Sequence, residues 1–140
     1  MKKQLLFFCS ILLLFSCSED SDPGTTIIRE ELDSTLTSGV WVVDLFIEDN
    51  EDETSDYENL RFSFLASGQV EVSEGGSLIE TGSWRTRIDD GFIVLDLNLS
   101  DDDALDDLSD DWYLIGFNAN RIELEEDDDD ADDFLILRKI

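Results

Sequence analysis

The sequence predicts an all-β protein, in which eight antiparallel strands in up-and-down order form a small barrel preceded by one short helix. Three observations predict this fold. From Val40 onward the apolar stretches are short, rich in β-branched and aromatic residues, and bounded by Gly, Asn, Asp and Ser. Several of these stretches alternate between apolar and polar residues, as strands with one buried face do. Tight turns separate several of them, so consecutive strands are expected to be neighbours.

The strand boundaries follow from this alternation and from the turn residues. Leu60 and Phe62 illustrate the alternation, since they fall on the same face of one strand. Short connections at 67–68, 89–91 and 118–120 contain the Gly and Asn residues that tight hairpins need. The eight strands are expected at residues 40–47, 57–66, 69–73, 78–87, 92–99, 112–117, 121–125 and 134–139.

In up-and-down order, successive connections alternate between the two ends of the sheet. The tight turns are the second, fourth and sixth connections, whereas the long acidic segments 48–56, 100–111 and 126–133 are the first, fifth and seventh. All three acidic segments are therefore expected at one end of the barrel, together with the short third connection at 74–77. That end would be open and strongly negative.

A helix is expected before the first strand, at residues 25–39. Ile28, Leu32 and Leu36 are spaced to lie on one face of this helix, and Gly39 is a stop signal. Because the helix leads directly into the first strand, we expect it to close the end that carries the tight turns.

The fifth connection contains a second helical signal. Ser100 is a suitable N-cap, acidic residues follow it in the first turn, and Leu105 and Leu108 would share one face. One or two helical turns here would form a lid over the acidic end. A disordered acidic loop is the alternative.

The N-terminus carries an export signal. Lys2 and Lys3 precede an apolar run at 5–15 that is too short to span a bilayer, which is the plan of a signal peptide. The run ends in Leu-Phe-Ser-Cys, which resembles the lipobox of bacterial lipoproteins and implies that Cys17 is acylated and becomes the mature N-terminus. Such acylation attaches enough chains for stable membrane anchoring. An ordinary secretory peptide cleaved nearby is the alternative.

Three regions are predicted from these features. Residues 1–16 form the lipoprotein signal peptide, 17–26 the lipidated cysteine and an acidic tether, and 27–140 the barrel domain. The tether begins Ser-Glu-Asp-Ser-Asp, which resembles the acidic surface-export signal of Bacteroidetes lipoproteins. This resemblance implies a lipid-anchored protein of the outer membrane, exposed on the cell surface.

Charge and residue usage exclude several functions. The 36 Asp and Glu residues outnumber 9 Lys and Arg, for a net charge of -27. Such a chain repels nucleic acid, so cations are the expected partners. Histidine is absent, and Cys9 and Cys17 lie in the signal peptide and at the lipidation site, so the mature domain offers no imidazole or free thiol. Nearly all carboxylates lie in solvated loops, and we therefore expect no enzymatic activity.

Several segments resemble lipocalins. Gly39, Val40 and Trp41 match the G-x-W pattern that opens the first lipocalin strand, and the later strands resemble the small lipocalin-like domains of Bacteroidetes lipoproteins. The resemblance implies a closed, lipocalin-like barrel in which the first and last strands pair and Arg138 packs over Trp41. An open sheet or a two-layered sandwich is the alternative if those strands lie apart.

Two sets of residues are candidates for binding. An apolar cavity inside the barrel would be lined by aromatic side chains, although core packing alone also explains them. These are Trp41, Phe62, Phe64, Trp84 and Trp112. A weak calcium site would use oxygen ligands from the acidic loops, although a solvated acidic collar also explains those residues. These are Asp101, Asp103, Asp106, Asp127, Asp128 and Asp130.

The sequence is therefore interpreted as a non-enzymatic lipoprotein of the cell envelope, whose lipocalin-like domain binds or interacts through acidic loops. No cofactor other than weakly bound Ca²⁺ is expected. An envelope protein is one possible partner. The alternatives are a carrier that holds a small apolar ligand inside the barrel, and a calcium-binding accessory protein of the cell surface.

Overall fold

The computed structural model describes residues 22–99, 105–126 and 133–140. Within them, the helix α1 (Pro23–Leu36) precedes nine strands and two short 3-10 helices. The strands are β1 (Val40–Glu48), β2 (Glu51–Asp52), β3 (Leu60–Phe64), β4 (Gln69–Glu74), β5 (Ser77–Asp89), β6 (Phe92–Asn98), β7 (Asp111–Asn118), β8 (Arg121–Glu126) and β9 (Phe134–Lys139). The 3-10 helices are η1 (Thr54–Tyr57) and η2 (Asp106–Leu108).

Some predictions lie outside the described residues. They concern the signal peptide, the lipidation of Cys17 and the N-cap Ser100. The calcium candidates Asp101, Asp103, Asp127, Asp128 and Asp130 lie outside as well.

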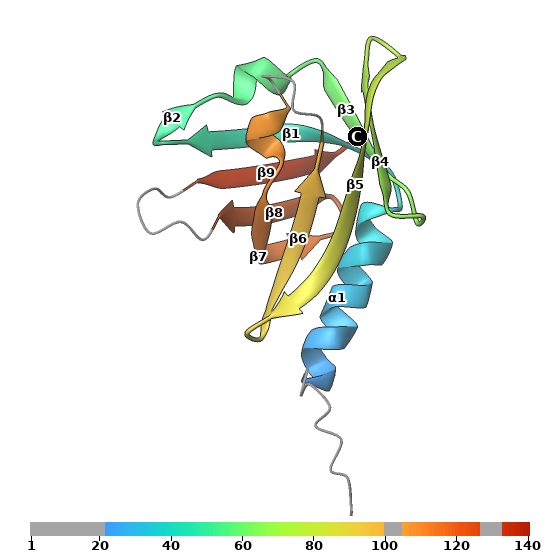
Figure 1. Cartoon of the computed structure of the whole chain (residues 1–140), viewed down its shortest axis with the longest axis vertical. Helices are drawn as coiled ribbons and strands as arrows, with labels where there is room; N and C mark the ends of the chain where they lie inside the picture. Colours follow the sequence, from blue (N-terminus) through green and yellow to red (C-terminus); the bar gives the residue numbers. More distant parts are fainter. Residues whose placement is uncertain (1–21, 100–104, 127–132) are drawn as a thin grey trace, which may run out of the picture.

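The strands form a closed antiparallel barrel (Figure 1). The sheet order is β2-β1-β3-β4-β5-β6-β7-β8-β9, and β1 also pairs with β9. That pairing runs from Trp41 opposite Lys139 to Ile47 opposite Phe134. The predicted up-and-down barrel of eight strands is confirmed, and the open-sheet and sandwich alternatives are wrong.

The ninth strand, β2, was not predicted. Asp49 and Asn50 have φ values of 50° and 65°, which reverse the chain directly after β1. Asp and Asn tolerate this left-handed conformation better than most residues. The turn pairs Glu48 with Glu51, so part of the first acidic segment is a hairpin added to the edge of β1.

The closure of the barrel places Arg138 differently from the lipocalin-based expectation. Its partner across the strand pair is Val42, whereas Lys139 lies opposite Trp41. The Arg138 Nε atom donates to Asp44 Oδ1 at 2.9 Å on the outer face of the barrel. Successive residues of a strand point to opposite faces, so Arg138 points outward while Trp41 is buried in the core.

Helix α1 begins two residues earlier than predicted, because Asp22 acts as its N-cap and Pro23 takes the first helical position. Leu32 and Leu36 are fully buried, as expected. Ile28 is 45% exposed, although it has the same spacing.

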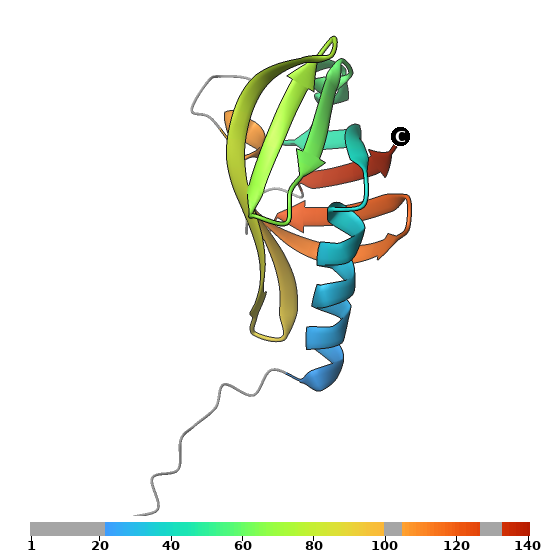
Figure 2. The ribbon, with the colours of Figure 1, turned by 90° about the vertical axis from the view of Figure 1, so that its right-hand side faces the viewer.

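Figure 2 shows the helix beside the β5–β6 hairpin and in front of part of the β7–β8 hairpin. Its N-terminal turns extend below the barrel, beyond the strands that the structure describes. Ile27, in the same turns, is 64% exposed. The hydroxyl of Thr86 on β5 donates to the Asp33 carboxylate and holds the helix against the sheet. No helix within the described ranges is both long and apolar enough to cross a membrane.

Candidate functional site

One end of the barrel carries a polar cavity of about 380 Å³, which we call the acidic mouth. Its residues come from the ends of β1 and β8 and from the connections that follow β1, β6 and β8, so the predicted convergence of the first, fifth and seventh connections is confirmed. They are Glu48, Asp49, Asp106, Asp107, Ser109, Asp110, Glu126 and Asp133. Residues of the third connection, 74–77, do not line this cavity.

A cluster of three carboxylates lies at this end. Glu48 ends β1, Glu53 precedes η1, and Asp107 lies in η2. One carboxylate oxygen of each lies within 4.8 Å of those of the other two. Burial, which has the largest effect, then the charges of Asp107 and Glu53 and a hydrogen bond with Glu53, together raise the pKa of Glu48 to about 7. Part of the Glu48 population therefore carries a proton at neutral pH.

A second group of carboxyls joins β8 to the other connections. Several effects together raise the pKa of Glu126 to about 7. Burial is the largest, followed by the charge and hydrogen bond of Asp110, and then by the hydrogen bond and charge of Asp133. Asp133 is only 8% exposed. Its Oδ1 atom accepts a hydrogen bond of 2.8 Å from the backbone N–H of Asp49. This bond ties the connection before β9 to the turn after β1.

Local hydrogen bonds explain why the carboxylate cluster is held in place on the β1 side. The Thr54 hydroxyl accepts from the backbone N–H of Phe46 at 2.9 Å, and the Glu53 N–H donates to the Phe46 carbonyl at 3.0 Å. Tyr57, at the end of η1, is buried, and its ring meets Phe46 edge to face with centroids 5.2 Å apart. Glu53 is therefore fixed above the end of β1.

On the other side, η2 is anchored by apolar contacts. Leu105 and Leu108 are buried in the core. Within the described residues, the predicted helical segment of the fifth connection is the 3-10 helix η2. The indole N–H of Trp112 donates to the Leu108 carbonyl at 3.0 Å. The Ser109 hydroxyl accepts from the backbone N–H of Leu99 at 2.9 Å. These bonds hold Asp107 over the mouth.

Of the six predicted calcium ligands, Asp106 is the one within the described residues, and it lines the mouth. The carboxylates that come closest together are different ones, and Glu48 and Glu53 were not predicted as ligands. Their signal in the sequence is weak, because one ends a strand and the other stands among several acids. The order of the strands predicts which end of the barrel carries the acidic connections. It does not predict which carboxylates at that end come together.

The five aromatic candidates lie in one continuous apolar core. Their side chains are buried, and the Phe64 and Trp84 rings pack edge to face with centroids 5.6 Å apart. The indole N–H groups of Trp41 and Trp84 donate to the carbonyls of Leu36 and Leu65 at 2.9 and 3.0 Å. This arrangement assigns the aromatic side chains a packing role.

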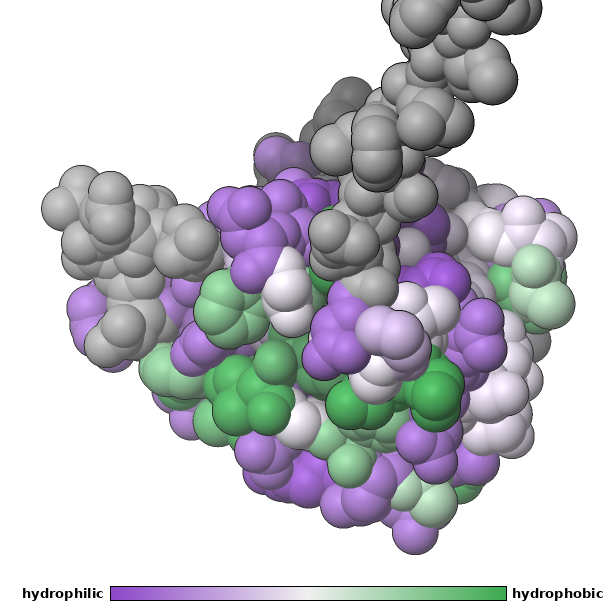
Figure 3. Space-filling view, turned by 90° about the horizontal axis from the view of Figure 1, so that it is seen from below, coloured by the Kyte–Doolittle hydropathy of each residue, from purple (hydrophilic) through white to green (hydrophobic). Residues whose placement is uncertain are grey.

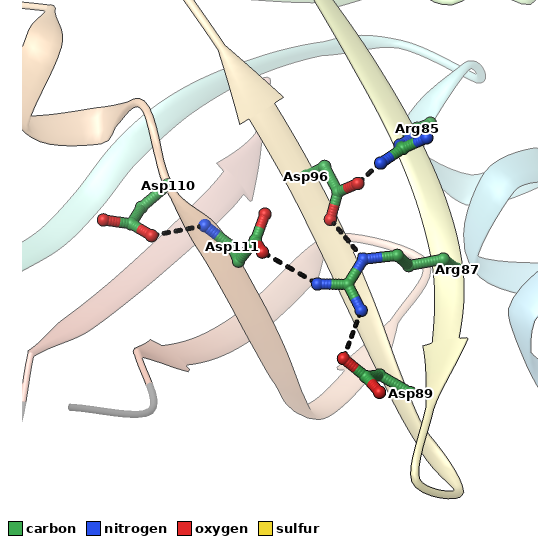
Figure 4. Close-up of polar contacts among 6 residues, drawn as sticks. All are labelled: Arg85, Arg87, Asp89, Asp96, Asp110 and Asp111. Carbon is green, nitrogen blue, oxygen red and sulfur yellow. Dashed lines mark hydrogen bonds and ion pairs between the residues drawn. The ribbon is translucent and has the colours of Figure 1, made fainter. Parts of the chain in front are cut away.

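A second polar region covers the outer face of β5, β6 and β7 (Figure 4). The Arg87 guanidinium contacts Asp96 at 2.9 Å, Asp111 at 2.8 Å, and Asp89. Arg85 also pairs with Asp96. A shallow cavity of about 690 Å³ opens beside these residues. Carboxylates of the protein contact all three nitrogens of the Arg87 guanidinium, which leaves Arg87 little capacity for an anionic ligand. The same ion pairs join β5, β6 and β7.

Comparisons with protein families, with curated proteins and with solved structures find no match for this chain. The fold and site define an eight-stranded antiparallel barrel with carboxylates gathered at one end.

Proposed function

We propose that this protein is a non-enzymatic interaction module of the bacterial cell envelope, anchored in the outer membrane through an acylated Cys17. One observation carries the proposal: carboxylates from three separate connections line a single cavity at one end of the barrel. The lipocalin-like character and the surface location rest on the sequence resemblances.

The chemistry of the mouth favours a cationic partner. Crowded carboxylates attract positive charge, and complementary charges raise association rates at low ionic strength. A protein surface rich in Lys and Arg fits this requirement. Glu48 and Glu126 have raised pKa values because burial and neighbouring acids disfavour their charged forms, and a cation that replaces those protons would relieve the repulsion.

A two-part experiment tests the anchored module. Mass spectrometry of the protein expressed in a bacterium with lipoprotein processing is expected to show acyl chains on Cys17, and none in a Cys17→Ser variant. Crosslinking on intact cells, followed by identification of the captured envelope proteins, is expected to yield a basic partner. Neutralising Glu48 and Asp107 together should reduce its capture, whereas neutralising the exposed Glu30 and Glu58 should not. An unacylated Cys17, or capture that ignores the mouth, contradicts the proposal.

Calcium binding is a second candidate, favoured by the 4.8 Å grouping of Glu48, Glu53 and Asp107. Calcium takes carboxylate and carbonyl oxygens as ligands. Thermal unfolding of residues 18–140 in sodium, magnesium and calcium chlorides at equal ionic strength tests it. A specific site raises the midpoint in calcium alone, because a ligand that binds only the folded state stabilises it. Equal effects of the three salts would mean charge screening.

The interior carrier remains a prediction. The packing of the aromatic side chains and their bonded indole N–H groups favour the mouth over the interior as the working region. Titration of residues 18–140 with an apolar fluorescent probe tests the carrier. Saturable binding of the probe that is weaker in Phe62→Leu would support a carrier function of the barrel interior.

A further inference from the structure

The lower end of the molecule exposes large apolar side chains. Ile27 in α1 is 64% exposed, and Phe92 at the start of β6 is 62% exposed. Figures 1 and 2 both place the N-terminal end of α1 and the β5–β6 turn at this lower end. Seen from below in Figure 3, hydrophobic patches lie among hydrophilic ones. Apolar side chains exposed together at one end of a strongly charged protein mark a candidate contact surface.

The anchor limits what this partner can be. Cys17 stands five residues before Asp22, which is the N-cap of α1. A fully extended chain of that length spans at most about 18 Å. The first turn of α1 must therefore lie close to the acyl chains that hold the protein. The 14 residues of α1 extend about 21 Å further.

The distribution of charge points to the same arrangement. Figure 1 shows β2 and η2, which border the acidic mouth, far from the N-terminal end of α1. Electrostatic forces between exposed groups are largely screened beyond about 8–10 Å at physiological salt. A barrel that stands on its lower end thus keeps the mouth away from lipid headgroups. Asp89, Asp90 and Glu30 still flank the apolar side chains, so uncharged headgroups fit this end better than anionic ones.

We infer that the lower end docks on the lipid surface that holds the protein's own anchor, with Ile27, Ile28 and Phe92 entering the headgroup region of an electrically neutral leaflet. Apolar and aromatic side chains gain free energy at that interface. The barrel then stands upright and presents its acidic mouth to the surroundings. This inference rests on the proposed lipid anchor and adds the orientation of the domain to it.

Single-cysteine labelling tests the orientation, since an acylated Cys17 leaves the mature chain no other thiol. We would label Ile27→Cys and Phe92→Cys with a polarity-sensitive fluorophore. The matched control is Leu78→Cys, because Leu78 is 59% exposed and lies in β5 just after the β4–β5 turn at the opposite end. The acylated full chain is placed in phosphatidylcholine vesicles that contain nitroxide-labelled lipid. For labels at 27 and 92, we expect the emission to shift to shorter wavelength and the nitroxide lipid to quench the fluorescence. For the label at 78 we expect neither change.

The outcomes separate this inference from the proposed function. If mass spectrometry shows an acylated Cys17 but the three labels behave alike, the docking is wrong and the anchor stands. If Cys17 carries no acyl chain, the anchor fails and the docking fails with it. As a second measurement, Ile27→Asp with Phe92→Asp should leave the melting midpoint unchanged but expose a label at position 28 to water-soluble quencher. Leu78→Asp should leave that label protected, and equal exposure in both variants would overturn the docking.

Discussion

The backbone N–H of Asp49 donates to the carboxylate of Asp133 across 84 residues of sequence, at 2.8 Å. This bond makes the turn after β1 and the connection before β9 one unit, in which Asp133 is a nearly buried acid beside Glu48 and Glu126. The same carboxylate therefore has two opposite effects. Its hydrogen bond stabilises the mouth, and its charge raises the pKa of both neighbouring glutamates.

Two substitutions separate these effects. Asp133→Asn keeps an oxygen that can accept from Asp49 and removes the charge, so it should stabilise the fold at pH 8. Asp133→Ala also removes the acceptor of this partly buried hydrogen bond, which costs about 0.5–1.5 kcal/mol. In urea unfolding, the free energy of unfolding of Asp133→Asn should exceed that of Asp133→Ala by about that amount. Equal stabilities would mean that water replaces the lost acceptor at no cost.

The stability of the fold should decrease as the pH rises from about 4.5 to about 7. Glu48 and Glu126 have pKa values near 7 in the folded protein against 4.5 for the unperturbed group. Between these values the folded state holds more protons than the unfolded state, so each unit of pH lowers the free energy of unfolding. Below 4.5 both states are protonated and the penalty vanishes; above 7 it is complete.

Asp52, whose pKa is lowered and not raised, does not affect how the stability changes between pH 4.5 and 7. The pKa of Asp52 is lowered below its ordinary value of 3.8 by hydrogen bonds from Thr54, so its contribution is lost only in stronger acid. Urea midpoints at pH 5 and pH 8, at constant ionic strength, measure the effect. Glu48→Gln with Glu126→Gln should flatten the profile, whereas Glu30→Gln with Glu58→Gln should preserve it. If the double variant Glu48→Gln, Glu126→Gln kept the same dependence of stability on pH, other groups would be responsible for it.

The sequence could predict the parts of this fold that depend on period and order. Alternation located the strands, and the alternation of connections located the acidic end. It could not predict β2, since that strand depends on Asp49 and Asn50 adopting positive φ in a segment with no apolar residue. Nor could it select Glu48 and Glu53, because proximity among many equivalent acids depends on η1 and η2, whose positions are fixed by contacts distant in sequence. Ile28 shows the limit of periodicity, which marks a helix face but not where the covering sheet ends.

Truncation of a buried side chain tests whether α1 is an integral part of the core. Leu36 is fully buried, and its carbonyl accepts the indole N–H of Trp41 at 2.9 Å. Leu36→Ala should destabilise the domain by about 2–5 kcal/mol, because it leaves a cavity beside Trp41. Urea unfolding followed by tryptophan fluorescence measures the loss. Ile28→Ala is the control on the same helix, and its half-exposed side chain should cost less than about 1 kcal/mol. Similar losses for both would mean that burial of Leu36 does not set the effect, and that α1 is not an integral part of the core.

Gly82 lies in β5, where the chain passes close to the end of β6. A Cβ atom at this position would lie 2.3 Å from the Asn98 carbonyl oxygen and 3.0 Å from the Leu99 side chain. Because the nearest atom belongs to the backbone of a paired strand, it cannot move without distorting the ladder. Gly82→Ala should therefore destabilise the barrel by about 1–3 kcal/mol, the usual cost of overpacking.

Gly116 in β7 provides the matched control for Gly82. It also lies in a strand and does not have a positive φ, and a Cβ atom added to it would meet no atom of the described residues within 4 Å. Gly116→Ala should be neutral or slightly stabilising, since alanine lowers the entropy of the unfolded chain. Denaturant midpoints of both variants decide the matter. A neutral Gly82→Ala would show that β5 and β6 can separate at this point, and that the strand contact there is weaker than its geometry implies.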